Sequence, residues 1–265
     1  MSSTPVVMSV AGSDCSGGAG IQADLKTFSH LNCYGTTAVT CIVAENPTEV
    51  RSITSLPAKK VREQMELIFD AFPVSVVKTG MLYSNSIIKE VCSFLKQIDS
   101  LKRPKIVVDP VMVSTTGTKL LRKNSIQTLL EELFPIATLI TPNIHEAQLL
   151  LAKKIVNELD AEQAAELLCK RWGAGVLVKG GHLAKDAVDF LAASKTHQSY
   201  RTDRIRGVKT NGTGCTYSAA IAAYLAQGNS LTESVGLAKS FMTRAIKSHL
   251  KLGHFKALNH YVVEP

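Results

Sequence analysis

The sequence lacks the paired cysteines that mark a disulfide framework or a zinc site. Its six cysteines are scattered through 265 residues, without a Cys-x-x-Cys pair or a repeated cysteine/histidine spacing. This usage is typical of a chain kept in a reducing cytoplasm. The seven histidines form no metal-ligand spacing with one another, so we interpret the isolated ones as structural or surface residues.

Long hydrophobic runs are also missing. No apolar stretch approaches the roughly 20 residues that a membrane-spanning helix requires. The opening MSSTPVVMSVAGSD has no basic region and too short an apolar run for a signal peptide. No low-complexity or charged block marks a linker, and 45% hydrophobic residues can bury a sizeable core. We therefore expect one domain over residues 1–265, located in the cytoplasm and without a membrane partner.

Charge of one sign is not concentrated anywhere in the chain. The net charge is +8, but the 30 lysines and arginines are spread through the whole sequence. Aromatic residues make up only 6% and do not alternate with the basic ones, as a single-strand binding platform would require. We expect no nucleic-acid partner, and we interpret the charge as a surface that attracts anionic metabolites.

Short β-rich runs alternate with longer helical patterns from end to end. The predicted strands are Pro5–Ala11, Thr36–Ala44, Ser75–Lys78, Lys105–Asp109, Thr138–Thr141 and Gly175–Lys179, with a hairpin of Val188–Ala192 and Gln198–Arg204. The predicted helices are Ile21–His30, Lys60–Phe69, Asn85–Gln97, Asn124–Leu133, His145–Leu151, Ala161–Trp172, Cys215–Ala226 and Leu231–Leu250. This alternation predicts βαβ units and a three-layer α/β/α fold around a mainly parallel sheet.

Polar or glycine-rich sequence follows six of the predicted strands. The six endings are Gly12-Ser13-Asp14, Glu45-Asn46, Lys78-Thr79-Gly80, Asp109-Pro110, Thr141-Pro142-Asn143 and Lys179-Gly180-Gly181. Ligands of parallel α/β sheets bind beyond the carboxyl ends of the strands. The six endings therefore predict a site along one edge of the sheet.

The first glycine segment, residues 12–20, admits a rival interpretation. Residues 18–23 read Gly-Ala-Gly-Ile-Gln-Ala, which satisfies a dinucleotide-binding fingerprint, and Glu45 stands where that fingerprint expects an acid for the ribose. However, six residues separate Ala11 from Gly18, whereas a dinucleotide fold places its glycines almost directly after the strand. The segment is not a phosphate-binding loop of the Walker type either, because no Gly-Lys-Ser/Thr closes it.

A second glycine turn, Asn211-Gly212-Thr213-Gly214-Cys215, opens a late apolar helix. Free N–H groups and the positive end of the helix dipole make a helix start an anion site, and glycine lets the backbone approach the anion closely. The alternative is an ordinary tight turn that enters a core helix. A dinucleotide oxidoreductase has no use for this turn, which counts against that class of protein.

Taken in order, the motifs resemble those of the hydroxymethylpyrimidine/phosphomethylpyrimidine kinases, thiamine-pathway members of the ribokinase-like superfamily. The resemblance spans nearly the whole chain. The segments that carry it are residues 12–28, Lys78-Thr79-Gly80-Met81-Leu82, Val108-Asp109-Pro110-Val111-Met112, Leu139-Ile140-Thr141-Pro142-Asn143, Val178-Lys179-Gly180-Gly181-His182, Gly212-Thr213-Gly214-Cys215-Thr216 and the tail containing Gly253-His254 and Asn259-His260.

The resemblance implies a ribokinase-like fold and transfer of phosphate from ATP, with Mg²⁺, to a hydroxymethylpyrimidine and then to its monophosphate. It also implies a homodimer. A pyridoxal kinase is the nearest alternative, because the same subfamily accepts that hydroxymethylpyridine. A catalytically silent pyrimidine or nucleotide sensor is the alternative from another class.

The same resemblance assigns the phosphate end of the pocket. Gly212, Thr213 and Gly214 would form an anion hole with Cys215, whose thiol at a helix start would have a lowered pKa and act as the base, with a small buried thiol that merely packs as the alternative. Lys179 would contact the ATP phosphates, with a solvated lysine at a strand end as its alternative. Asn143 and Glu146 match an Asn-x-x-Glu element that helps to place Mg²⁺ and phosphate, although the spacing also suits a helix capping box. Asp109, like Glu146, would contact the metal through water, or would simply fix its turn.

At the substrate end, the resemblance points to Gly12, Asp24, Glu45, Met81 and Val108. Asp24 would contact the hydroxyl, with a surface position in a first helical turn as its alternative. Met81 and Val108 would sandwich the ring, with core packing as theirs. Many relatives carry glutamine at the position of Glu45, and a carboxylate can only accept hydrogen bonds unless it is protonated. Glu45 therefore leaves the identity of the heterocycle open.

Overall fold

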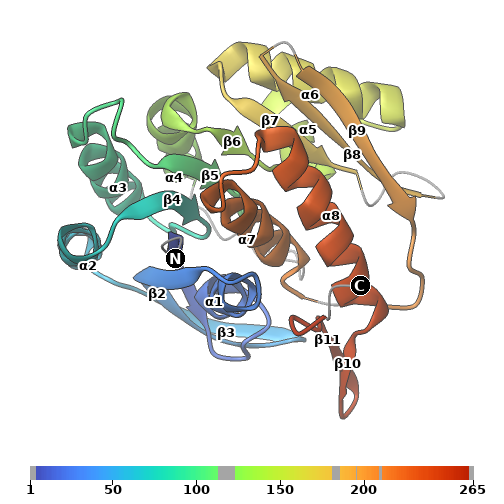
Figure 1. Cartoon of the computed structure of the whole chain (residues 1–265), viewed down its shortest axis with the longest axis horizontal. Coiled ribbons are helices and arrows are strands. Elements are labelled where there is room, and N and C mark those ends of the chain that lie inside the picture. Colours follow the sequence, from blue (N-terminus) through green and yellow to red (C-terminus); the bar gives the residue numbers. More distant parts are fainter. Residues whose placement is uncertain (1–3, 113–122, 181–185, 195, 209–210, 263–265) are drawn as a thin grey trace.

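The fold is built on one nine-stranded sheet with the strand order β3-β2-β1-β4-β5-β6-β7-β8-β9. It is seen in a computed structural model that describes residues 4–112, 123–180, 186–194, 196–208 and 211–262 (Figure 1). The strands are β1 Val6–Asp14, β2 Tyr34–Asn46, β3 Glu49–Ser55, β4 Val74–Thr79, β5 Lys105–Val108, β6 Leu139–Ile140, β7 Gly175–Lys179, β8 Asp186–Ala193 and β9 Thr196–Asp203. The six strands from β2 to β7 along the sheet are mutually parallel, whereas β3, β8 and β9 join antiparallel.

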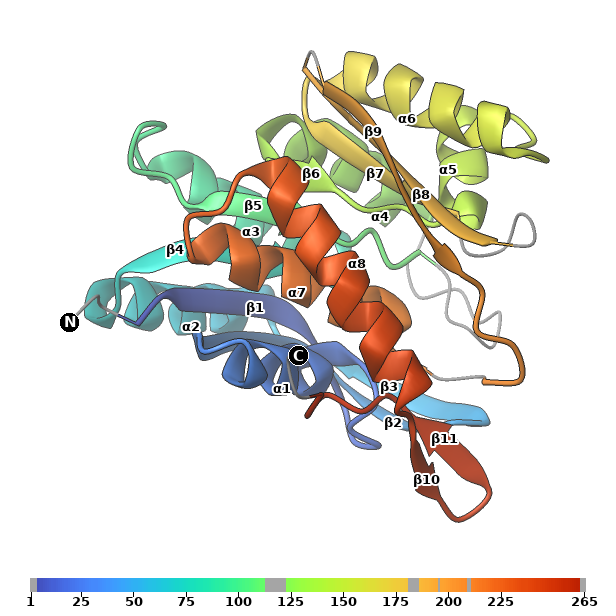
Figure 2. The same ribbon diagram turned by 45° about the vertical axis from the view of Figure 1, so that its right-hand side comes forward.

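Helices cover both faces of the sheet, which confirms the predicted three-layer architecture (Figure 2). They are α1 Gly20–His30, α2 Ala58–Ala71, α3 Asn85–Gln97, α4 Lys123–Thr128, α5 Ile144–Leu151, α6 Glu158–Trp172, α7 Thr213–Ala226 and α8 Leu231–Lys247. A π-helical turn, Leu129–Leu133, continues α4, and a 3₁₀ turn, Phe134–Ile136, follows it. In the described part of the chain, no helix is long and apolar enough to cross a membrane.

Alternating strand residues build a separate core on each face of the sheet. Met8 of β1 and Val77 of β4 pack with α2 and α3, while their neighbours Val7 and Val76 pack with α1, α7 and α8. The period of two follows from the pleat, which turns successive side chains to opposite faces. Helix α7 is buried along ten consecutive residues because it lies between the sheet and α8 (Figure 1).

The six predicted strand endings do meet at one edge, because the strands that carry them are parallel. The chain also changes direction there. β1 lies between β2 and β4. The connection through α1 leads from β1 to β2 on one side of it, and the connection through α2 leads back across to β4 on the other side. Such a switch point leaves a crevice outside the carboxyl ends of the strands. This is where the two glycine segments lie. Gly181 and His182, which belong to one motif, fall outside the described residues.

Two features were absent from the sequence prediction. β3 pairs antiparallel with the end of β2, and most of its side chains are exposed, so it has no buried apolar face to predict it. A small hairpin of β10 (Leu250–Leu252) and β11 (Phe255–Ala257) projects beyond the end of α8 (Figure 2). The predicted helix Leu231–Leu250 is therefore too long, since α8 ends at Lys247 and Leu250 begins β10.

Candidate active site

The two glycine segments, residues 12–20 and 211–215, lie against each other in the structure. Gly212 has a φ of 75°, and a Cβ atom added there would lie 1.8 Å from the carbonyl oxygen of Gly18. Only glycine permits this conformation and this close approach. The turn before α7 is therefore docked directly on the loop that follows β1.

The side chain of Asp14 binds the backbone of the first segment, residues 12–20. Its side chain accepts hydrogen bonds from the backbone N–H groups of Ser16 (2.7 Å), Gly18 (3.0 Å) and Ala19 (2.7 Å). These donors are therefore already occupied. The first N–H groups of α7, at Thr213, Gly214 and Cys215, have no acceptor within their own helix. The second turn is thus the better anion site.

An ion pair lies directly under this second turn. The Nζ of Lys179, at the end of β7, is 3.2 Å from Oδ1 of Asp109, which follows β5. A Cβ atom added at Gly214 would lie 3.4 Å from both Asp109 Oδ2 and Lys179 Nζ, and Ser218 of α7 donates to Oδ2 at 3.3 Å. Burial lowers the pKa of Lys179, but the negative charges of Asp109 and Glu146 outweigh that effect and raise it. Lys179 is therefore a cation, 12% exposed at its side chain, beside the start of α7.

Asn143 and Glu146 form a complete capping box at the start of α5. The Asn143 side chain accepts from the Glu146 N–H at 3.0 Å, and the Glu146 carboxylate accepts from the Asn143 N–H at 2.9 Å. Glu146 also accepts from the N–H of Met112 at 3.2 Å. Burial raises the pKa of Glu146, and the nearby charge of Lys179 opposes this. The capping role is thus present, beside Lys179 and Asp109.

A second ion pair, between Asp24 and Lys78, is completely enclosed. Both side chains are 0% exposed, and Lys78 Nζ lies 2.9 Å from each oxygen of Asp24, which also accepts from Ser9. Burial raises the pKa of Asp24, against the opposing charge of Lys78. The surface alternative for Asp24 is therefore wrong. The expected contact with the substrate hydroxyl is not supported either, because both carboxylate oxygens are bound inside the protein.

Cys215 lies between the two ion pairs, and its predicted lowered pKa is wrong. Burial raises the pKa of the thiol to about 11, and the negative charges of Asp109 and Asp24 add to this. The charge of Lys78 and a hydrogen bond from the backbone of Gly20 act in the opposite direction without cancelling it. Although Cys215 is only partly buried, desolvation outweighs the helix start, so the thiol is mainly protonated near neutral pH.

The predicted substrate residues lie together only in part. A Cβ atom added at Gly12 would lie 2.8 Å from Cys41 Sγ and 3.8 Å from Met81 Sδ. Cys41 and Met81 belong to a small apolar cluster against which Val111 packs. Val108 is 0% exposed and packs in the large core on one face of the sheet instead. The structure thus groups Gly12 with Met81, and it favours core packing for Val108.

Glu45 lies near the end of β2, beside the first glycine segment. Its backbone N–H and C=O both face the Sγ of Cys15, at 3.4 and 3.1 Å. Burial, together with the negative charge of Asp14, raises the pKa of Glu45 to about 7. The carboxyl group therefore changes its protonation state within the physiological range.

Three polar residues of the site received no role from the sequence: Asp14, Lys78 and Ser218. A charged residue at the end of an apolar strand run, as in Val76-Val77-Lys78, was the available signal for a buried lysine. His260 was expected to be a structural histidine. It is buried, and its Nε2 lies 3.0 Å from Oγ1 of Thr216 in the first turn of α7, while burial lowers its pKa to about 4.

Solved structures establish the class of protein that this fold and site define. Pyridoxal kinase from Bacillus subtilis, crystallised with ADP, superposes with a TM-score of 0.87 and 36% identity, covering 97% of this chain and 98% of that one. Phosphomethylpyrimidine kinase from Clostridium difficile superposes with a TM-score of 0.81 and 40% identity, covering 92% and 100%. The chain is a kinase with a ribokinase-like fold.

The family within that class follows from the sequence relatives. The model of the phosphomethylpyrimidine kinase family matches residues 14–260. A hydroxymethylpyrimidine/phosphomethylpyrimidine kinase of Rhizobium meliloti is 40% identical, covering 97% of both chains. The bifunctional thiamine biosynthesis protein ThiED of Geobacter sulfurreducens is 43% identical over 93% of this chain, which spans only 50% of that protein. The chain belongs to the phosphomethylpyrimidine kinase family.

Proposed function

We propose that the chain transfers phosphate from ATP to the hydroxymethyl group of 4-amino-5-hydroxymethyl-2-methylpyrimidine, and then to the monophosphate, to make the diphosphate precursor of thiamine. The observation that carries the proposal is the anion turn Gly212–Cys215 lying against the Lys179–Asp109 pair. Phosphoryl transfer depends chiefly on positioning and on neutralising charge. A helix start with a lysine beside it supplies both.

In the proposed first reaction, the hydroxymethyl oxygen attacks the γ-phosphorus while the bond to the bridging β–γ oxygen breaks. The N–H groups of Thr213, Gly214 and Cys215 hold the oxygens of the moving group, and Lys179 offsets their charge. Cys215 in its thiolate form accepts the proton of the hydroxyl. A thiol with a pKa of about 11 is rarely ionised at neutral pH, but it is a strong base when it is.

The residues also suit Mg²⁺ held through water. Among the described residues no three His, Cys, Asp or Glu side chains cluster as a metal site. Asp109 and Glu146 each already bind protein donors, but each carboxylate oxygen keeps a second lone pair. Mg²⁺ keeps several waters and uses one or two carboxylates with substrate phosphates. When bound, it would neutralise the phosphate charge beside these two residues.

At the other end of the pocket, Gly12 and Met81 would hold the heterocycle and Glu45 would bind its polar edge. An aminopyrimidine presents a ring-nitrogen acceptor beside an amino donor, so its partner must both donate and accept. A protonated Glu45 does both, and an ionised Glu45 does so only toward a protonated ring. In either case the complex contains one shared proton. The homodimer and cytoplasmic location remain part of the proposal on the family resemblance.

The test is ATP consumption with hydroxymethylpyrimidine, with its monophosphate and with pyridoxal in parallel. We expect turnover of both pyrimidines. Turnover of pyridoxal alone would replace the thiamine assignment with a vitamin B6 kinase, and no turnover with any of the three would favour a binding protein without catalysis.

The shared proton gives a second prediction, for pyrimidine binding measured by calorimetry without ATP. Glu45 is protonated below about pH 7 and ionised above it. The affinity of the wild type for the pyrimidine should therefore stay constant below that pH. It should then fall by up to about tenfold per pH unit above it. Glu45→Gln, whose amide donates and accepts at every pH, should bind with a flat profile from pH 6 to 9. A flat wild-type profile would remove Glu45 from recognition of the heterocycle.

A further inference from the structure

A buried carboxylate, Asp189 on β8, joins three elements behind the phosphate end of the site. Its Oδ1 accepts from the backbone N–H of Gly180 at 3.0 Å, and its Oδ2 accepts from Lys239 Nζ on α8 at 2.7 Å. Asp189 is 2% exposed and Lys239 is 8% exposed. None of the roles above uses this pair.

The position of Asp189 is set by the pairing of β7 with β8. Lys179, the last residue of β7, is directly opposite Asp189 in the antiparallel register. The hydrogen bond to Gly180 therefore holds the first residue beyond the strand, next to the lysine that faces the anion turn. This bond adds a contact one residue beyond the end of the ladder at Lys179.

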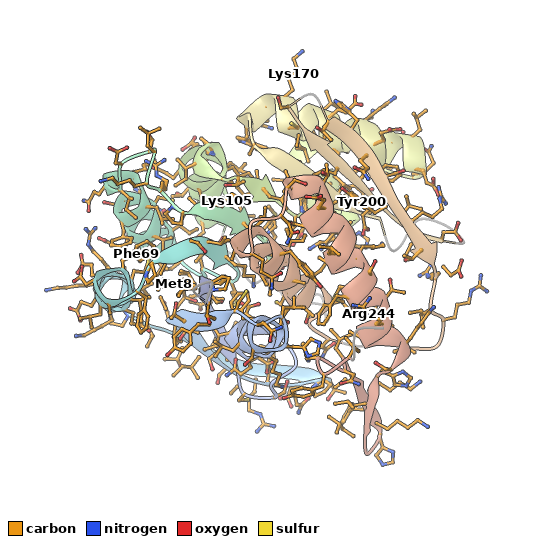
Figure 3. All side chains as sticks on the ribbon, in the orientation of Figure 1. Met8, Phe69, Lys105, Lys170, Tyr200 and Arg244 are labelled. Carbon is orange, nitrogen blue, oxygen red and sulfur yellow. The ribbon has the colours of Figure 1, made fainter. Side chains whose placement is uncertain are left out.

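The other partners of Asp189 hold it firmly. Lys239 belongs to α8, whose first turn accepts a 2.8 Å hydrogen bond at the Thr232 carbonyl from the Tyr200 hydroxyl of β9. Tyr200 is labelled in Figure 3. Tyr217, two residues after Cys215 on α7, also lies near this carboxylate. Burial raises the pKa of the Tyr217 hydroxyl, and the negative charge of Asp189 raises it further. The carboxylate thus lies between the helix of the anion turn and the strand of the phosphate lysine.

Stability alone does not explain such an arrangement. Desolvating two charges costs about as much as their attraction returns, and replacing a buried pair by apolar residues is often neutral. A fixed geometry is what the pair adds. Here that geometry concerns one backbone N–H, at the residue after Lys179.

We propose that Asp189, held in place by Lys239, is a positioning residue that fixes the chain at Gly180 and thereby aims Lys179 at the phosphates of a bound nucleotide. This inference rests on the proposed function, because it assigns the nucleotide phosphates to Lys179. It assigns no contact between Asp189 and the nucleotide itself.

Two double variants separate the tether from the ion pair. Asp189→Asn/Lys239→Met removes both charges but leaves a side-chain oxygen that can accept from Gly180. Asp189→Leu/Lys239→Met removes the charges and the acceptor together. Neither leaves an unpaired buried charge, which would itself be strongly destabilising. Arg201→Gln serves as the control, since Arg201 pairs with Glu158 and Asp186 on the exposed side of the same hairpin.

The measurement is the Kd of AMP-PCP, a non-transferable ATP analogue, by calorimetry with Mg²⁺, together with the KM of the pyrimidine. We expect the leucine variant to bind AMP-PCP about tenfold more weakly than the asparagine variant, with an unchanged pyrimidine KM. The asparagine variant and Arg201→Gln should stay within about twofold of the wild type.

Equal AMP-PCP affinities of the two double variants would overturn the positioning role. A leucine variant with a raised KM for the pyrimidine and an unchanged Kd for AMP-PCP would also overturn it. If the leucine variant does not fold, Asp189→Ala/Lys239→Met makes the same comparison. Failure of the wild type to bind AMP-PCP at all would instead overturn the proposed function and, with it, this inference.

Discussion

The anion turn lies between two lysine–aspartate pairs that differ in how completely the protein encloses them. Lys78 and Asp24 have no exposed side-chain surface, and the lysine contacts both carboxylate oxygens. The side chains of Lys179 and Asp109 are 12% and 5% exposed, and a single contact of 3.2 Å joins Lys179 Nζ to Asp109 Oδ1. We call the first the closed pair and the second, which keeps a little exposure, the open pair.

This difference separates two uses of the same residues. An ammonium group that still reaches water can turn donors toward an arriving phosphate, whereas one bound bidentately inside the protein cannot do so without leaving a buried charge unpaired. We therefore expect the open pair to control turnover and the closed pair to control folding. Cys215 lies between them, and the field of both acts on its thiol.

The largest effect is expected at Cys215. Cys215→Ala should lower kcat for the first phosphorylation by about 10²–10⁴-fold, the usual contribution of a general base. The second phosphorylation should suffer far less, because the acceptor is then a phosphate that is already ionised near neutral pH and needs no base. Rapid-quench rates with each substrate measure this ratio.

The same residue predicts a pH dependence with a definite sign. Because the pKa of the thiol is about 11, kcat for the first step should rise with pH throughout the range from 6 to 9, whereas the second step should show no such rise. Equal losses at both steps in Cys215→Ala would identify the thiol as a packing residue rather than a base.

A smaller loss is expected when the open pair is broken. Lys179→Met should lower kcat/KM for ATP by about 10²–10³-fold, as removal of one preorganised donor does. The melting temperature should fall less than in Lys78→Met, because Asp109 keeps its contact with Ser218 when the lysine is removed. Steady-state kinetics and thermal unfolding are compared with Lys153→Met, an exposed surface control. If Lys179→Met were nearly as active as the wild type, Lys179 would not contact the ATP phosphates.

The closed pair should give the opposite result. Lys78→Met leaves Asp24 buried and unpaired, at a cost of about 3–5 kcal/mol in the free energy of unfolding. Asp24→Leu/Lys78→Met removes both charges and should recover most of that loss in urea unfolding. If Lys78→Met were as stable as the wild type but inactive, the contrast between the two pairs would be broken, and Lys78 would belong to the catalytic machinery.

The sequence predicted the sheet edge well, because each piece of evidence for it was local. A buried strand that ends on Asp109-Pro110 or on Lys179-Gly180 is visible in a few consecutive residues, and parallel connections bring such ends together. The edge strand β3 escaped prediction because it is polar on most of its length.

Electrostatic partners could not be predicted in the same way. Lys78 meets Asp24 across 54 positions of sequence, and nothing in either segment identifies the other. The pKa of Cys215 depends on how tightly other elements enclose it, so a rule based on the helix start alone gave the wrong direction. Gly212 was singled out from the sequence, but its contact with Gly18 depends on two loops that are far apart in the chain.

That contact has a consequence for how the enzyme moves during its cycle. A carbonyl oxygen in the place of a missing Cβ leaves no gap across which the turn before α7 and the loop after β1 could slide. The two segments should move as one unit, and under the proposed function this unit would carry both the nucleotide and the pyrimidine. A motion of one segment alone would separate this contact, so the two reactants should keep a constant spacing during the cycle.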